Sequence, residues 1–299
     1  MQFSDRIFGG STRFLQVPAV LAIIMLLRCS SLYYYPDQVE YSKPEEYGPF
    51  ESLSIDVEGV SLDGWYFPSA KSPTRAVVLQ FHGNAQNISS HASLGVWLTQ
   101  FGYDFMTYDY RGFGKSEGSP DPKRNYEDAL IVLKMADDRA REKGVPLIIL
   151  GQSLGGAIAL RALADFDQSN VGLIIADSTF ASYDSMVRNA IRNTVGSWLT
   201  FLAFFFDDEY SPIHTLDQVS RLPLLVIHSR FDPVVPFSEG RSIYENWQGR
   251  KELWALEVDG HLSWSNYGSG KTDQRLVDFL DRMLARGFHD SKRQPKVAD

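Results

Sequence analysis

One short stretch of this 299-residue sequence places a nucleophilic side chain between glycines. Gly151-Gln152-Ser153-Leu154-Gly155 follows the pattern G-x-S-x-G, directly after the apolar run Leu147–Leu150 and before a segment rich in small residues. A strand, a sharp turn and a helix in this order expose a serine hydroxyl at the edge of a sheet, and the glycines leave room for neighbouring backbone. In this context Ser153 is the candidate nucleophile.

A serine hydroxyl attacks well only when a base removes its proton and an acid orients that base. Candidates for both roles follow the last two apolar runs. Leu224–His228 leads to Asp232, and Leu253–Val258 leads to His261. Because open α/β sheets place their sites at the carboxyl ends of parallel strands, we expect a triad of Ser153, Asp232 and His261.

Other residues compete for the roles of acid and base. Asp177 also follows an apolar run and is an alternative acid for the same imidazole. We favour Asp232 because Pro233 and Pro236 stiffen its loop. The remaining histidines either stand at strand ends, where a structural role is the simpler interpretation, or lack the required context: His82, His91, His214, His228 and His289.

The oxyanion that forms during acyl transfer needs two backbone N–H donors. One is expected from Leu154, which follows the nucleophile. The other is expected from the turn His82–Ala85, which follows the apolar run Ala76–Phe81. In that turn Asn84 is the first candidate and Ala85 the second.

Apolar runs alternate with helical patterns along the chain, and this alternation predicts the strands and helices that position these residues. Strands are predicted at 53–57, 65–67, 76–81, 104–108, 147–150, 172–176, 224–228 and 253–258. Helices are predicted at 90–100, within 126–142, at 154–163, over much of the stretch up to 221, at 238–247 and at 273–284. The first two strands predict an antiparallel pair, and the rest predict an α/β fold with a mostly parallel sheet flanked by helices. We expect one catalytic domain at 51–288 and a polar tail at 289–299.

Composition excludes several classes of function. The formal net charge of −8 and the pI near 5.3 argue against a nucleic-acid partner, since phosphate binding needs a basic face. The single cysteine, Cys29, excludes an intramolecular disulfide and a multi-cysteine metal site. We expect neither a metal nor a cofactor.

The N-terminus has the layout of a signal sequence. Arg6 and Arg13 precede the apolar run Phe14–Leu27, whose 14 residues span about 21 Å as a helix, less than a hydrocarbon core of about 30 Å. The run ends just before Cys29 and resembles a bacterial lipoprotein signal, although Arg28 stands where a small residue is usual. Residues 1–32 are therefore predicted as a lipoprotein signal with Cys29 lipidated, or as an uncleaved membrane anchor.

Residues 33–50 are polar and contain prolines, which predicts a linker between this segment and the domain. The positive flank of the apolar run lies upstream, and acidic residues lie downstream. The positive-inside rule therefore predicts a membrane-attached domain outside the cytoplasm, on the periplasmic face in a bacterium.

Four motifs together resemble the α/β-hydrolase superfamily, and within it a group of membrane-attached bacterial and eukaryotic serine hydrolases. The motifs are HGNA (His82–Ala85), DYRGFG (Asp109–Gly114), GQSxGG (Gly151–Gly156) and DSTFxSY (Asp177–Tyr183). The resemblance implies the α/β-hydrolase fold with a small cap insertion, the same triad, and hydrolysis of small-molecule esters or thioesters. Ser229 and Leu262 depart from the usual pattern, and Asp109 and Arg111 are expected to brace loops.

An apolar segment, residues 198–206, lies where this fold inserts its cap. Either core packing or an acyl-binding lid lined by Trp198, Phe201, Phe204 and Phe205 would explain this segment.

Two other functions stay open. A peptidase or amidase uses the same triad, and a non-catalytic scaffold uses the same fold, although the presence of all triad members disfavours it.

Overall fold

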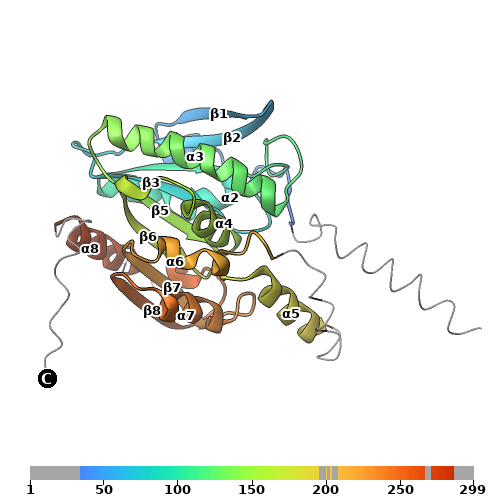
Figure 1. Cartoon of the computed structure of the whole chain (residues 1–299). Helices are drawn as coiled ribbons and strands as arrows, with labels where there is room; N and C mark the ends of the chain where they lie inside the picture. The colour runs from blue at the N-terminus through green and yellow to red at the C-terminus, as the bar shows by residue number, and fades with distance from the viewer. Residues whose placement is uncertain (1–33, 195–199, 201–202, 204–207, 267–270, 286–299) are drawn as a thin grey trace, which may run out of the picture.

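The computed structural model describes residues 34–194, 200, 203, 208–266 and 271–285. Its centre is an eight-stranded sheet with the strand order β1-β2-β4-β3-β5-β6-β7-β8 (Figure 1). The strands are β1 (Glu51–Val57), β2 (Val60–Phe67), β3 (Ala76–Phe81), β4 (Tyr103–Tyr108), β5 (Leu147–Gln152), β6 (Val171–Asp177), β7 (Leu224–Phe231) and β8 (Lys251–Asp259). β2 is antiparallel to β1 and β4, and the other pairs are parallel.

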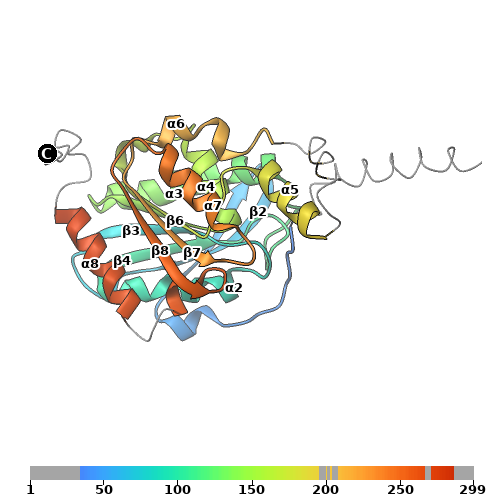
Figure 2. The ribbon, with the colours of Figure 1, turned by 90° about the horizontal axis from the view of Figure 1, so that it is seen from below.

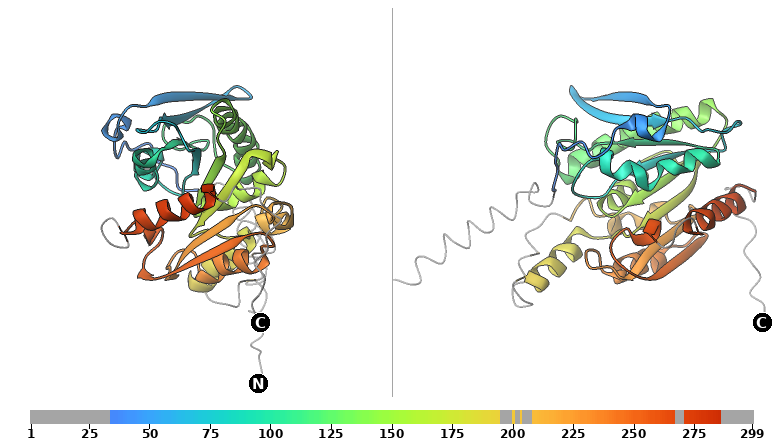
Figure 3. Two further views of the ribbon diagram at one scale, coloured as in Figure 1. Left: turned by 90° about the vertical axis from the view of Figure 1, so that its left-hand side faces the viewer. Right: turned by 180° about the vertical axis from the view of Figure 1, so that it is seen from behind.

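Helices cover both faces of the sheet. The longer ones are α3 (Pro122–Glu142), α4 (Leu154–Leu163), α5 (Tyr183–Thr194), α7 (Phe237–Asn246) and α8 (Lys271–Ala285). The shorter pieces are η2 (Pro44–Tyr47), α2 (Ile88–His91), η3 (Ala92–Leu94), η4 (Val96–Phe101), η5 (Gln168–Asn170), η7 (Pro212–His214), α6 (Leu216–Val219) and η8 (Ser263–Asn266). α8 and α3 lie on opposite sides of the sheet (Figure 3).

Two separate hydrophobic clusters bury the two faces of the sheet. One includes side chains from α3, α4 and α7, such as Leu133, Leu160 and Ile243. The other includes side chains from η4 and α8, such as Leu98 and Leu276. Because both faces are covered, the central strands β3, β4, β5 and β6 are buried at every position, including the polar residues Gln80, Asp104 and Thr107.

The helix predicted at 90–100 differs from expectation. The structure divides it into α2, η3 and η4, with Gly95 at the break. A side chain at Gly95 would overlap the ring of Phe105 on β4, so the break lies in close contact with the sheet. The apolar pattern identified the buried face but not the break.

Residues 34–50, most of the predicted linker, lie against the domain. Tyr34 is buried in the larger cluster, and Pro36 pairs with Gln86 in an isolated parallel bridge.

Helix α5 extends beyond the end of the sheet opposite to α8 (Figures 1 and 2). No helix in the described ranges is long and apolar enough to cross a membrane.

Candidate active site

Ser153 occupies a strained turn between β5 and α4. Its φ of 51° and ψ of −121° lie in a region that residues with side chains rarely adopt, and it is 6% exposed. The backbone on both sides of the turn is held by hydrogen bonds. The Ser153 N–H donates to the Asp177 carbonyl at 2.9 Å, and the Thr179 hydroxyl donates to the Ser153 carbonyl at 2.6 Å. This is the turn expected of a nucleophilic serine.

Gly155 shows why the turn needs small residues. A Cβ at this position would overlap the carbonyl oxygens of Phe81 and His82, at the end of β3. The first turn of α4 can therefore approach β3 only with glycine there. This approach also brings the loop after β3 close to the nucleophile, because a Cβ added to Gly83 would lie 3.6 Å from Ser153 Cβ.

The structure brings Asp232 and His261 into direct contact. His261 Nδ1 lies 2.8 Å from Asp232 Oδ2. Asp232 follows β7 and His261 follows β8, and the two strands pair in parallel, so both residues lie at the edge of the sheet where Ser153 also stands. The Asp232 side chain is fully buried, whereas that of His261 is 19% exposed. A buried acid that orients a partly exposed base is the arrangement a catalytic triad requires.

Asp232 is held as a carboxylate by its neighbours. Burial acts to raise the pKa of Asp232, but the hydrogen bond and charge of His261 outweigh it and keep this pKa below its ordinary value. The N–H groups of Val234 and Val235 act in the same direction, since they donate to Asp232 Oδ1 at 2.8 and 2.9 Å. The stiff loop predicted from Pro233 thus fixes the acid through two backbone donors.

Asp177, the alternative acid, has different partners. Its carboxylate accepts from Gln152 Nε2 at 3.2 Å and from the Ser178 hydroxyl at 3.2 Å. Complete burial raises the pKa of Asp177 to about 7, although Gln152 and the charge of His261 act to lower it. The group that directly orients His261 in the structure is therefore Asp232.

The loop after β3 contains Asn84 and Ala85, the two candidates for the second oxyanion donor. Asn84 Oδ1 accepts from the N–H of Ala85, the second candidate in this turn, at 2.9 Å. Leu154 is the first residue of α4, so its N–H has no partner within the helix. A Cβ added to Gly83 in this loop would lie 3.6 Å from Leu262 Cδ1, so the residue after His261 also lies near the loop.

Two residues at the site, Ser178 and His228, have contacts that the sequence did not predict. Ser178 has a φ of 50°, and its hydroxyl accepts from the Leu262 N–H at 3.3 Å, which links the turn after β6 to the turn that carries His261. His228 Nε2 lies 3.6 Å from Asp232 Oδ2 and 2.9 Å from the Val235 carbonyl. The motif DSTFxSY was the available signal for Ser178, whereas nothing in the sequence placed His228 beside the acid.

The motif DYRGFG supports loops, as expected. Asp109 Oδ1 accepts from the Ile88 N–H at 2.8 Å, and Arg111 forms a buried ion pair with Asp128 at 2.7 Å. Ser229, a departure from the family pattern, donates to the Val258 carbonyl and so joins β7 to β8. Within the described part of the chain, no group of three or more His, Cys, Asp or Glu side chains is arranged to hold a metal ion.

Several predicted residues lie outside the described residues. They are the lid candidates Trp198, Phe201, Phe204 and Phe205, the N-terminal segment with Cys29, and the tail from 289 to 299. Helix α5, which leads toward the lid segment, is described, and its first residue, Tyr183, is buried with Phe180 and Ala181 in the larger cluster.

The chain is similar to known hydrolases in both sequence and structure. The family described as "Serine aminopeptidase, S33" matches residues 72–208. The uncharacterized protein YfhR of Salmonella typhi is 33% identical over 283 residues, which cover 89% of this chain and 93% of YfhR. The lysophosphatidylserine lipase ABHD12 of Danio rerio is 26% identical over 303 residues, covering 88% and 78%. The esterase Pf2001 of Pyrococcus furiosus superposes with a TM-score of 0.66 at 20% identity, covering 85% of this chain and 99% of that one.

The predicted fold class is confirmed by this structural similarity and by the mostly parallel sheet. The sequence similarity extends beyond the motifs, because it covers about nine tenths of the chain. The protein therefore belongs to the same family of hydrolases with the α/β-hydrolase fold as YfhR.

Proposed function

We propose that the protein is a serine hydrolase that cleaves carboxylic esters or thioesters through an acyl-enzyme on Ser153. The observation that carries the proposal is the 2.8 Å contact between His261 Nδ1 and Asp232 Oδ2, at the edge of the sheet where Ser153 stands on its strained turn. A base oriented by a buried carboxylate next to such a serine is the arrangement that activates a hydroxyl for acyl transfer.

The reaction proceeds in two halves. Ser153 Oγ attacks the acyl carbon while His261 Nε2 takes its proton, and the alcohol or thiol then leaves with that proton. Asp232 accepts from the Nδ1–H of His261, keeps Nε2 as the basic nitrogen and stabilises the imidazolium. A water molecule, deprotonated by the same imidazole, then hydrolyses the acyl-enzyme to the acid and regenerates the serine.

The backbone N–H groups of Leu154 and Asn84 stabilise the oxyanion in this proposal. Leu154 is supported by its place at the start of α4, next to the nucleophile. Asn84 is the first candidate in the turn after β3, and the Ala85 N–H, the second candidate, donates to the Asn84 side chain. Two donors at 2.7–3.1 Å from the oxyanion are the usual requirement for acyl transfer.

Ester or thioester substrates are supported by the lipase and esterase among the similar proteins. An amidase or peptidase is the second candidate, and the description of the matching family as a serine aminopeptidase favours it. The two differ in the leaving group, because an amine must be protonated before it departs. Hydrolysis of matched p-nitrophenyl ester and p-nitroanilide substrates with the same acyl group distinguishes them.

Attachment to a membrane through residues 1–32, with the domain outside the cytoplasm, is part of the proposal. Its support comes from the sequence, where Arg6 and Arg13 precede the apolar run Phe14–Leu27. Cys29 is the proposed lipidated residue if the segment is a lipoprotein signal, and the same segment is otherwise an uncleaved anchor.

Hydrolysis of short p-nitrophenyl esters by the wild-type protein and by Ser153→Ala tests the proposed function. Ser153→Ala should reduce kcat to background with an unchanged melting temperature, because it removes only the attacking oxygen. Ser54→Ala is the matched control, since Ser54 is an exposed serine on β1 that bonds to Ser61. Activity that survives in Ser153→Ala would show that Ser153 is not the nucleophile.

A further inference from the structure

Residues 35–42, called the strap below, run alongside the loop that carries the proposed oxyanion donor. The Tyr35 N–H donates to Asn84 Oδ1 at 3.0 Å, and Pro36 pairs with Gln86 in a parallel bridge. The Asp37 carbonyl accepts from the Gly114 N–H at 2.9 Å, in the motif DYRGFG. The strap is thus bonded to two loops beside the site.

Asn87 is the centre of this contact. It is 3% exposed, and its amide nitrogen donates to Asp37 Oδ1 and to the Val39 carbonyl, both at 2.8 Å. Its amide oxygen accepts from the Ser89 N–H at 3.0 Å and so caps α2. One buried side chain therefore joins the strap to the end of the oxyanion loop.

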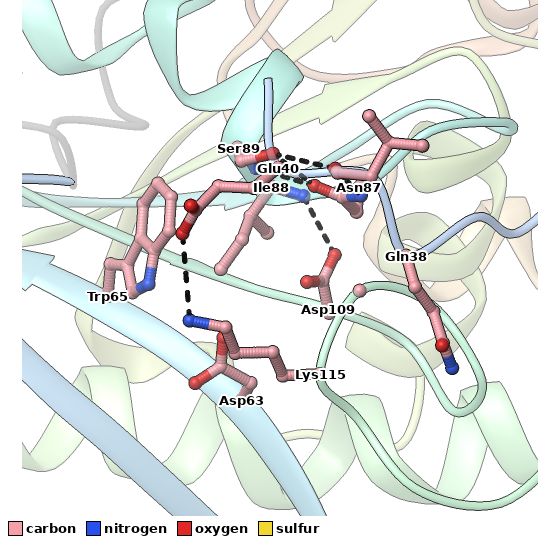
Figure 4. Close-up of a pocket in the computed structure, with 11 residues that line it drawn as sticks. Gln38, Glu40, Asp63, Trp65, Asn87, Ile88, Ser89, Asp109 and Lys115 are labelled. Atoms are coloured by element: carbon pink, nitrogen blue, oxygen red, sulfur yellow. Dashed lines mark hydrogen bonds and ion pairs between the residues drawn. The ribbon is translucent and has the colours of Figure 1, made fainter. Parts of the chain in front are cut away.

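The contact continues past Asn87 to Ser89 in α2. The Tyr41 N–H donates to the Ser89 hydroxyl at 3.0 Å, and the Ser42 hydroxyl donates to the Ser89 carbonyl. Gln38 and Glu40 of the strap line the same pocket as Asn87 and Ser89, and the Glu40 carboxylate points toward Lys115 (Figure 4). A polar contact of this extent, centred on the buried Asn87 and Ser89, fixes the position of a backbone, because the buried partners lose their hydrogen bonds when the strap moves.

The loop between Gly83 and Asn87 needs such support. Ala85 and Gln86 have φ angles of 70° and 58°, so two consecutive residues with side chains lie in the left-handed region. That conformation persists only where its surroundings enforce it. Part of this support comes from the domain, since His91 Nε2 lies 3.2 Å from the Ala85 carbonyl and Asp109 accepts from the Ile88 N–H (Figure 4). The strap provides the rest.

We propose that the strap is a positioning element for the oxyanion loop and that Asn87 is its main positioning residue. The inference rests on the proposed function, in which the Asn84 N–H stabilises the oxyanion. When the strap is loosened, Ala85 and Gln86 relax toward right-handed conformations and the Asn84 N–H moves away from its position. The substrate still binds, but the transition state loses a donor, so kcat falls while KM changes little.

The proposal gives the polar segment after the N-terminus a role in catalysis. The apolar run ends at Leu27, so only residues 28–34 separate it from the strap. The residues nearest to the proposed membrane attachment are therefore also bonded to the proposed oxyanion loop.

Asn87→Ala in the full-length chain tests the proposal, and Asn170→Ala is the matched control. The Asn170 amide nitrogen likewise donates to a carboxylate and a carbonyl, Asp137 at 2.9 Å and Val145 at 3.3 Å, in a part of the structure remote from the loop. The readouts are kcat and KM for p-nitrophenyl butyrate per fluorophosphonate-titrated site, together with the melting temperature. We expect Asn87→Ala to lower kcat about 10- to 100-fold with KM within threefold, and Asn170→Ala to keep kcat within twofold.

A purely structural role of Asn87 predicts a different result. Both variants would then lower the melting temperature while kcat per titrated site stayed at the wild-type value, and that result overturns the proposal. Asp37→Ala is the milder variant if Asn87→Ala fails to fold, because Asp37 is half-buried; a three- to tenfold loss of kcat is expected, and wild-type kcat contradicts the proposal.

Exchanging the side chains of Asn87 and Asp37 tests whether the hydrogen bond between them maintains kcat. Asn87→Asp places two carboxylates side by side and should lower kcat, and adding Asp37→Asn restores a donor and an acceptor across the same contact. We expect the double variant to recover at least fivefold in kcat over Asn87→Asp, and no recovery contradicts the proposal. These results differ from those expected if the proposed function itself is wrong. In that case the wild-type protein would not react with the fluorophosphonate, and Ser153→Ala would keep the wild-type activity.

Discussion

His261 Nδ1 lies 2.8 Å from Asp232 Oδ2, although the two residues are 29 positions apart in the sequence. The contact forms because β7 and β8 pair in parallel and end at the same edge of the sheet. The Oδ1 atom of the same carboxylate is occupied by two backbone N–H groups, so the acid has a fixed orientation toward the imidazole.

The first prediction separates the two candidate acids. Asp232→Asn should lower kcat by about 10⁴, because the amide favours the wrong tautomer of His261. Asp177→Asn should change kcat less than tenfold, since its partners are Gln152 and Ser178. Steady-state kinetics with p-nitrophenyl acetate at pH 8 measures both. A severe loss in Asp177→Asn with a mild one in Asp232→Asn would reverse the assignment.

A second prediction concerns the effect of Asp177 on stability. Burial raises the pKa of Asp177 from its ordinary value of 3.8 to about 7 in the folded state. Between these values the folded protein binds more protons at this site than the unfolded chain does, so this group lowers the free energy of unfolding as pH rises from about 4 to 7. The loss is at most about 1.4 kcal/mol per pH unit.

Asp177→Asn removes this titration while keeping the shape of the side chain. Urea unfolding at pH 5 and pH 8 should therefore show a smaller decrease in the free energy of unfolding for the variant than for the wild type. Parallel decreases in both proteins would mean that Asp177 keeps an ordinary pKa in the folded state.

The sequence was sufficient to predict the order of elements and the residues at the ends of the strands. Buried parallel strands read as unbroken apolar runs, and the run before Ser153 ended where β5 ends within two residues. Asp232 and His261 followed from the same rule, because they lie four and three residues after the runs Leu224–His228 and Leu253–Val258. The break at Gly95 was missed; Gly95 lies against the ring of Phe105 on a neighbouring strand, a contact that the local pattern does not report.

Contacts between distant segments were the other feature that the sequence did not predict. Residues 33–50 have the composition of a linker, and no local pattern indicates that Asn87 bonds to Asp37 and Val39. The same holds for His228 beside Asp232. Such contacts are set by the tertiary fold, whereas composition and periodicity report only on local structure and burial.

A third prediction concerns the N-terminus. The full-length protein should fractionate with membranes, and a chain that lacks residues 1–32 should be soluble with wild-type kcat, because all the proposed catalytic residues and the strap are retained. A chain that lacks residues 1–42 is the informative comparison, since it loses the strap and should lose kcat. Full-length protein in the soluble fraction would contradict membrane attachment.

The fourth prediction concerns residues 198–206. If Phe204 and Phe205 line an acyl site, each added methylene of the substrate should contribute up to about 0.8 kcal/mol, or roughly fourfold in kcat/KM, until the site is filled. Esters of two to twelve carbons measure this slope in the wild type and in Phe204→Ser/Phe205→Ser. A flatter slope in the variant with normal short-ester activity supports the lid. An equal loss at every chain length with a lower melting temperature indicates core packing instead.

Peptide mapping after reaction with a fluorophosphonate probe identifies the nucleophile directly. The mechanism predicts one adduct per chain, on the peptide that contains Ser153, and no adduct in Ser153→Ala. It also predicts much slower labelling in His261→Ala, because the base that activates the hydroxyl is removed. An adduct on another residue, or labelling of Ser153→Ala at the wild-type rate, would contradict the proposal that this protein is a hydrolase acting through Ser153.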